Sequence, residues 1–269
     1  MDRAIPTQRH ELRVGIVCEE RHGMLFVLPL SILIGVSLGM LGGGGSILTV
    51  PILTYVADMD PKAAIASSLF VVGVTSATAA ITHARAGRVR WQTGIVFGAA
   101  GMVGAFAGGR LAAYIPGHVL MIVFGLMMAA TAIAMIRKPR KLAAPMIGDL
   151  PVGKVVIEGI VVGIVTGIVG AGGGFLVVPA LVLLGGLGME IAVGTSLIVI
   201  SMKSFAGLAG HLGHVDIDWR VTLAVTAAAV IGSLLGGRLV GRIPPAALRR
   251  GFGFFIIAMA ILVLFKELS

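Results

Sequence analysis

Two glycine clusters are the part of this sequence whose residue types and spacing best suit ion binding. Consecutive glycines cost about 1 kcal/mol each inside a helix, so each cluster should interrupt a helix. The interruption leaves backbone N–H groups free, and the positive end of the next helix dipole adds to them. Together these groups form a site for a small anion without any charged side chain. The expected binding residues are Gly42, Gly43, Gly44, Gly45 and Ser46 in the first cluster, and Gly170, Gly172, Gly173 and Gly174 in the second.

The clusters have a second interpretation, in which the glycines only allow two helices to cross closely. An isolated pair of glycines would favour close crossing. Here a glycine-rich run occurs twice, and a proline follows each run at the same distance, as Pro51 and as Pro179. This duplication favours the binding interpretation.

Hydroxyl side chains form a second duplicated pattern, in which Ser67 and Ser68 recur as Thr195 and Ser196. These hydroxyls have the chemistry to donate to an oxyanion. They also have the option of bonding back to a carbonyl one turn earlier in their own helix, which is common for Ser and Thr in apolar helices. The binding interpretation is stronger for Ser68 and Ser196, because the residue is identical in both copies.

Three further residues carry charge or can titrate. Lys203 is the only basic residue well inside an apolar segment, and its counterpart in the first half is Thr75. An ionisable group at such a depth costs at least about 2.5 kcal/mol and is a candidate for function, here as a counter-ion to an anion; the alternative is that its side chain extends to the interface. His83 and His211 end equivalent segments and are candidates for a proton relay, or else they cap helix ends.

The two halves of the chain are related by an internal duplication. A shift of 128 residues places Gly39 on Gly167 and Trp91 on Trp219. Residues 39–133 then align with 167–261 without a gap, and about a third of the aligned pairs are identical. The protein is therefore a tandem repeat.

Composition sets the environment in which the repeat must fold. Hydrophobic residues make up 57% of the chain and charged residues only 12%, with a mean hydropathy of +1.04. A soluble domain carries about 25% charged residues, so this composition indicates an integral membrane protein. The Lys and Arg residues lie in short clusters between apolar runs, which argues against nucleic-acid binding. The lone cysteine, Cys18, excludes an internal disulfide.

The apolar runs predict an all-α membrane fold with about five segments per half. Three runs in each half are long enough to cross a bilayer, which takes roughly 20 residues. The segments that contain the glycine clusters, 24–57 and 155–187, are predicted to be broken, with a short helix beginning near Ser46 or Gly174. Matching broken helices mark the substrate site in transporters that are built from inverted repeats.

The charges of the loops indicate the relative orientation of the halves. Loop 83–92 contains Arg88 and Arg90, whereas the equivalent loop 211–219 has aspartate at both positions. Arginine also collects in 242–250 and not in the equivalent turn 114–118. The positive-inside rule then places equivalent loops on opposite sides of the membrane, which predicts an inverted repeat.

The chain divides into four segments. Residues 1–23 are a polar extension without the apolar core of a secretory signal, and Met24 is a candidate for the native start. The first repeat covers 24–137, a cytoplasmic linker covers 138–153, and the second repeat covers 154–269.

The motifs Gly39–Pro51 and Gly167–Pro179, with the stretch His214–Trp219, resemble the sulfite exporter TauE/SafE family of permeases. The resemblance covers the chain from Met24 onward. It implies a multi-pass protein of the bacterial inner membrane that transports sulfite, sulfoacetate or related sulfonates, and it implies that transport is coupled to protons. The sequence departs from the family pattern at Arg88 and Arg90, where the second half keeps Asp216 and Asp218.

The expected function is secondary transport of a small anion, with the lipid bilayer as environment and H+ as the coupling ion. We find no catalytic signature, so we expect neither an enzyme nor a cofactor or metal. A passive anion channel is the alternative, and a membrane enzyme is a more distant one. The sequence leaves open whether the protein is a monomer or a homodimer.

Overall fold

The computed structural model describes residues 26–40, 42–43, 45–136, 152–170, 172–174, 177–178, 181, 187–239 and 245–268. Within these residues the regular structure is entirely helical, and the predicted all-α fold is confirmed. The extension 1–23, most of the linker 138–153 and the candidate residue Gly44 lie outside the described residues.

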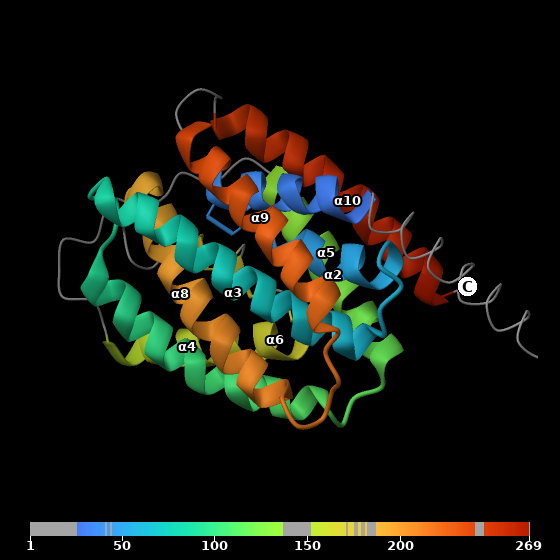
Figure 1. The fold of residues 1–269 in the computed structure, drawn as a ribbon. Helices are drawn as coiled ribbons and strands as arrows, with labels where there is room; N and C mark the ends of the chain where they lie inside the picture. Colours follow the sequence, from blue (N-terminus) through green and yellow to red (C-terminus); the bar gives the residue numbers. More distant parts are fainter. Residues whose placement is uncertain are drawn as a thin grey trace, which may run out of the picture.

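The helices follow the duplication seen in the sequence (Figure 1). The first half contains the helix Phe26–Met40, α2 (Ser46–Tyr55), α3 (Pro61–Arg85), α4 (Trp91–Ala112) and α5 (Gly117–Ile136). The second half contains α6 (Val152–Val169), α8 (Met189–His211), α9 (Trp219–Leu239) and α10 (Pro245–Leu268). Among the described residues, four segments are long and apolar enough to span a membrane, and they belong to α3, α4, α8 and α9.

Aspartate side chains fix where two of these helices begin. The carboxylate of Asp60 accepts hydrogen bonds from the N–H groups of Lys62 and Ala63, and Pro61 occupies the first position of α3. The carboxylate of Asp218 accepts in the same way from the N–H groups just inside α9. Because the first N–H groups of a helix have no partner within the helix, these carboxylates supply the missing acceptors.

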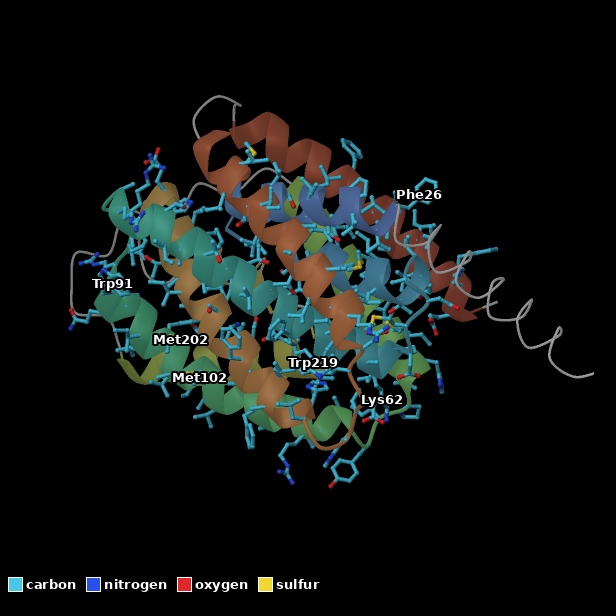
Figure 2. The ribbon with its side chains drawn as sticks, viewed as in Figure 1. Phe26, Lys62, Trp91, Met102, Met202 and Trp219 are labelled. Atoms are coloured by element: carbon cyan, nitrogen blue, oxygen red, sulfur yellow. The ribbon has the colours of Figure 1, made fainter. Side chains whose placement is uncertain are left out.

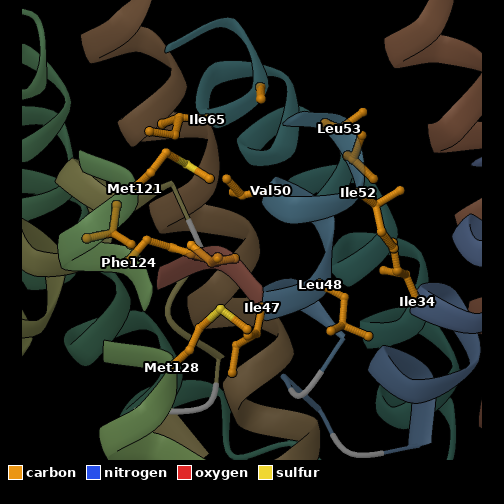
Figure 3. Close-up of a cluster of buried hydrophobic side chains, with 14 of the residues drawn as sticks. Ile34, Ile47, Leu48, Val50, Ile52, Leu53, Ile65, Met121, Phe124 and Met128 are labelled. Atoms are coloured by element: carbon orange, nitrogen blue, oxygen red, sulfur yellow. The ribbon is translucent and has the colours of Figure 1, made fainter. Parts of the chain in front are cut away.

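The short helix α2 lies in the interior and does not cross the molecule. A helix of 10 residues is about 15 Å long, half of what a bilayer requires. Its residues from Ser46 to Thr54 are all buried. Ile47, Val50 and neighbouring apolar side chains of α2 pack against Met121, Phe124 and Met128 of α5 (Figure 3).

The long helices pair across the two halves. Ser201 Oγ of α8 donates to the carbonyl of Gly73 in α3 (3.1 Å), and one turn earlier in α3 the side chain of Leu69 lies against Gly207. Contacts that move backward along α3 therefore move forward along α8, so these equivalent helices run antiparallel, as Figure 1 shows. Since Gly73 and Ser201 are related by the 128-residue shift, a pseudo-twofold axis passes between them, perpendicular to the helices.

Glycines allow further helices of opposite halves to touch through their backbones. Gly232 of α9 lies against the carbonyl of Ile32, and the equivalent Gly104 of α4 lies against the carbonyl of Ile160 in α6. The helix Phe26–Met40 thus packs on the second half, and its counterpart α6 packs on the first half. The two halves are interlocked.

Candidate functional site

The two glycine breaks meet at the centre of the molecule. A Cβ added to Gly43 would overlap the backbone of Gly174, and a Cβ added to Gly174 would overlap Gly43. Gly42 and the equivalent Gly170 both have positive φ, at 70° and 74°. Only glycine adopts such a conformation without strain, so both breaks depend on their glycines for backbone shape as well as for close approach.

Ser68 and Ser196 hold the breaks in place from the opposite half. Ser68 Oγ contacts the carbonyl of Gly170 (2.5 Å), and Ser196 Oγ contacts the carbonyl of Gly42 (3.0 Å). Each hydroxyl also reaches a carbonyl three residues earlier in its own helix. A hydroxyl group has only one proton to donate, and in each serine that proton is shared between the two carbonyl groups. In this conformation both serines therefore stabilise the breaks and have no proton left to donate to a ligand.

Lys203 extends from α8 to the second break. Its side chain is 1% exposed, and its Nζ lies 2.9 Å from the point where a Cβ of Gly173 would stand. Its methylene groups pass along Gly101 of α4. Among the described residues, the ammonium group has no hydrogen-bond partner. A buried cation without a partner is costly, which makes this position a candidate for binding a negative charge.

Donors other than Lys203 surround the same position. Gly172 and Gly173 both have positive φ, and their N–H groups have no acceptor within the described part of the chain. Ser204 Oγ lies 2.8 Å from the point where a Cβ of Gly172 would stand, and it is buried without a partner in the described part of the chain. The sequence analysis did not select Ser204, although the 128-residue shift aligns it with the identical Ser76, whose hydroxyl is likewise buried without a described partner.

The remaining candidate residues divide into two groups. Gly45 packs against the helix Phe26–Met40, and Ser46 donates to the carbonyl of Gly43 (2.7 Å), so both support the first break. Ser67 and Thr195 turn away from the breaks. Thr195 Oγ1 accepts from the N–H of Arg90 at the start of α4, and Ser67 Oγ accepts from Thr222 Oγ1 of α9.

The two histidines lie in the last turns of α3 and α8, and neither belongs to the glycine clusters themselves. His83 Nε2 lies 3.3 Å from the carbonyl of Gly39, in the last turn of the helix Phe26–Met40. His211 Nδ1 lies 3.0 Å from the carbonyl of Gly207 in its own helix. In each ring the other nitrogen is buried and has no partner among the described residues. Both residues remain candidates for moving a proton.

The arrangement has the properties of an anion site inside a bundle of apolar helices. One ammonium, one hydroxyl and two backbone N–H groups lie at the second break, and each is a hydrogen-bond donor without an acceptor among the described residues. The described residues contain no cluster of His, Cys, Asp or Glu that could hold a metal ion. Small ligands of transporters bind between such broken helices, near the middle of the membrane.

Comparison with known proteins places the chain among membrane transporters. The family model described as "Sulfite exporter TauE/SafE" matches residues 27–263. A "Probable membrane transporter protein" of Xylella fastidiosa (strain Temecula1) is 33% identical over 242 residues, covering 87% of this chain and 92% of the relative. The "Probable membrane transporter protein YdhB" of Bacillus subtilis (strain 168) is 24% identical, covering 90% of this chain and 100% of the relative.

More distant likenesses also carry transporter names. The "Probable membrane transporter protein MamO" of Magnetospirillum gryphiswaldense is 27% identical over 281 residues, which cover 87% of this chain and 44% of the relative. No solved structure matches the chain. The family match spans both glycine breaks, the helices that hold them and Lys203, and the chain belongs to the sulfite exporter TauE/SafE family of membrane transporters.

Proposed function

We propose that this transporter carries small, sulfur-containing anions such as sulfite and sulfonates across the bacterial inner membrane, as a multi-pass protein coupled to protons. The observation that carries the proposal is the ammonium of Lys203, buried at the glycine break of the second half without a partner among the described residues. An oxyanion there would neutralise the ammonium and accept from the N–H groups of Gly172 and Gly173.

Proton coupling is the second part of the proposal. His83 and His211 lie in the last turns of the helices that border the breaks, and each ring keeps one buried nitrogen free within the described residues. A histidine changes its charge near neutral pH, which suits a residue that takes up and releases a proton during each cycle.

Uptake by proteoliposomes tests both parts. We expect sulfite uptake that saturates with concentration and accelerates when a pH gradient is imposed. The Lys203→Met variant should lose this uptake, whereas Lys203→Arg should retain part of it, because the arginine keeps the charge in a different shape. Wild-type vesicles that take up no sulfite or sulfonate would overturn the proposed substrate class.

The same assay separates a carrier from a passive channel, which remains the second candidate. A channel would give a flux that rises linearly with concentration and follows the membrane potential alone. Saturation together with counterflow, in which unlabelled internal substrate drives labelled substrate inward, is expected only for a carrier.

A further inference from the structure

We propose that the substrate is a monoanion, and that it binds off the pseudo-twofold axis, between Lys203, Ser204 and the N–H groups of Gly172 and Gly173. The inference rests on the proposed function, because it names the charge and the position of the anion that the transporter carries. It follows from a difference between two otherwise equivalent breaks.

The asymmetry begins with residue types at equivalent positions. The 128-residue shift pairs Lys203 with Thr75 and Ser204 with Ser76. Thr75 Oγ1 donates to the carbonyl of Val71 (2.6 Å), so it is neutral and satisfied within its own helix. The serines are identical, and both hydroxyls are buried without a partner among the described residues. The equivalent positions of α3 and α8 thus share a hydroxyl group, but only α8 adds a cation beside it.

Geometry places the cation and the hydroxyl at the same break. Lys203 and Ser204 are consecutive in α8, and consecutive residues of a helix point in directions about 100° apart. The backbone of the second break nevertheless passes close to both side chains. Lys203 Nζ lies near Gly173 and Ser204 Oγ lies near Gly172, at 2.9 and 2.8 Å from the respective Cβ positions. Lys203 Nζ and Ser204 Oγ therefore both lie against Gly172–Gly173, where methyl groups of Val72 and Thr166 supply the apolar part of the surroundings.

The charge count sets the charge of the ligand. Lys203 is the only buried Lys or Arg among the described residues. A single ammonium in an apolar interior neutralises one negative charge, and a second negative charge would remain buried without compensation, which is strongly unfavourable. Monoanionic sulfonates and hydrogensulfite, the monoanion of sulfite, fit this site, whereas dianions such as sulfate, sulfoacetate or the doubly charged sulfite ion do not.

A carboxylate of the protein itself is the alternative to a bound anion as the partner of the Lys203 ammonium. Glu158 of α6 has one buried carboxylate oxygen without a partner, and it lies on the helix that packs along Gly101 beside the lysine stem. No carboxylate of the described residues lies within 4.0 Å of the Lys203 ammonium. In this conformation the lysine charge is therefore available to a ligand.

The test compares two tetrahedral anions of similar size and different charge, methanesulfonate and sulfate, by calorimetry on the full-length protein in detergent at constant ionic strength. We expect methanesulfonate to bind at least 10-fold more tightly than sulfate. Ser204→Ala should weaken methanesulfonate binding several-fold, and Lys203→Met should abolish it. Glu158→Gln should leave the preference unchanged.

A second cation at the equivalent position provides the reciprocal test. Thr75→Lys should reverse the preference in favour of sulfate, because two ammonium groups then face the breaks. The matched control Thr78→Lys, one turn along the same helix, should keep the preference of the wild type. If Thr75→Lys does not fold, the affinities of the wild type and of Ser204→Ala for the two anions still test the proposed preference for a monoanion.

The outcomes distinguish this inference from the proposed function. Saturable sulfite transport by a protein that binds sulfate and methanesulfonate equally well would overturn the charge rule and leave the transporter proposal intact. A protein that binds and transports none of these anions would overturn both. Tighter methanesulfonate binding by Glu158→Gln would show that the carboxylate competes for Lys203, which would overturn the assignment of an uncompensated lysine.

Discussion

At the scale of single residues, Lys203 is placed at a cost to stability. Its ammonium is buried in the middle of an apolar bundle without a partner among the described residues. Such groups destabilise a protein unless a ligand or an ion neutralises them, so they persist where they serve a function. The cost and the function can be measured on the same variant.

We expect Lys203→Met to be more stable than the wild type in the absence of substrate. Methionine has similar volume and carries no charge, so the free energy of unfolding should rise by on the order of 1–3 kcal/mol. The measurement is the melting temperature in detergent, combined with uptake, which should be lost. The control is Lys62→Met, whose Nζ donates to the carbonyl of Ala113 at the end of α4 and which should keep uptake.

The serine braces give a second expectation at this scale. Ser68→Ala and Ser196→Ala each remove the hydroxyl that contacts a carbonyl of the opposite break. Each should lower the free energy of unfolding by about 0.6 kcal/mol, and by no more than about 1.7 kcal/mol, which are the average and the maximum for such bonds between membrane helices. The two losses should be similar because the sites are equivalent. Thr78→Ala, which loses only a bond to its own helix, should change the melting temperature less. A much larger effect at one serine than at the other would contradict the equivalence of the two breaks.

Single residues also show how far the sequence determines the site. The duplication and the glycine composition were sufficient to predict both breaks, because a run of glycines has few alternatives to an interrupted helix. Lys203 could be predicted as a site residue because it is the only basic residue well inside an apolar segment of the sequence. The sequence pattern did not separate Ser67 and Thr195 from Ser68 and Ser196; adjacent residues of a helix point in different directions, and Ser67 faces the start of α9 while Thr195 faces the start of α4. Ser204 had a detectable signal in its identity with Ser76.

At the scale of helices, glycine residues determine which helices can pack with their backbones in contact. Gly104 and Gly232 lie against carbonyl groups of α6 and of the helix Phe26–Met40, where a Cβ has no room. The sequence predicted the helices themselves from hydropathy. It did not predict which helices pair, because pairing between distant segments depends on backbone shapes that complement one another and leave little trace in hydropathy.

We expect Gly104→Val and Gly232→Val to destabilise the protein by roughly 1–3 kcal/mol or more, since the added methyl groups push two backbones apart. The two losses should be similar because the contacts are equivalent. Gly153→Val is the control, as nothing lies within 4 Å of its Cβ position. The measurement is the yield of monodisperse protein and its melting temperature. A destabilised Gly153 variant would show that valine in a helix, and not the crossing, causes the loss.

At the scale of the whole molecule, the antiparallel pairing of α3 with α8 has a consequence for the membrane. If these helices cross the bilayer, the pseudo-twofold axis lies in its plane, and equivalent loops emerge on opposite sides. Trp91 and Trp219, which begin the equivalent helices α4 and α9, lie toward opposite ends of the bundle (Figure 2).

Single cysteines test the orientation of the halves. We expect Gln92→Cys and Asp216→Cys, each in a Cys18→Ser background, to be labelled by an impermeant maleimide from opposite sides of the membrane. Both side chains are exposed and lie beside the equivalent tryptophans. The readout is mass spectrometry after labelling of intact spheroplasts and of inverted vesicles. Labelling of both positions from one side would mean that the two halves are parallel.

The interlocking of the halves also predicts how the chain behaves when it is divided. A break introduced in the linker 138–153 should leave neither half able to form a monodisperse protein alone, because each half lacks the partners of its glycine faces. Co-expression of both halves should restore sulfite uptake. A first half that purifies as a stable monomer by itself would contradict the interlocked arrangement.

The interlocking of the halves also means that helices which pack together are synthesised at different times. Among the described helices, Phe26–Met40 leaves the ribosome first, yet its partner α9 begins only at Trp219. At roughly 5–20 residues per second, the wait is on the order of ten seconds or more. During that time the glycine-lined face of the nascent helix has only lipid or the insertion machinery to cover it. Membrane insertion and folding are therefore separate events for this protein, and we expect a chain that terminates before α9 to lack a partner for the helix Phe26–Met40.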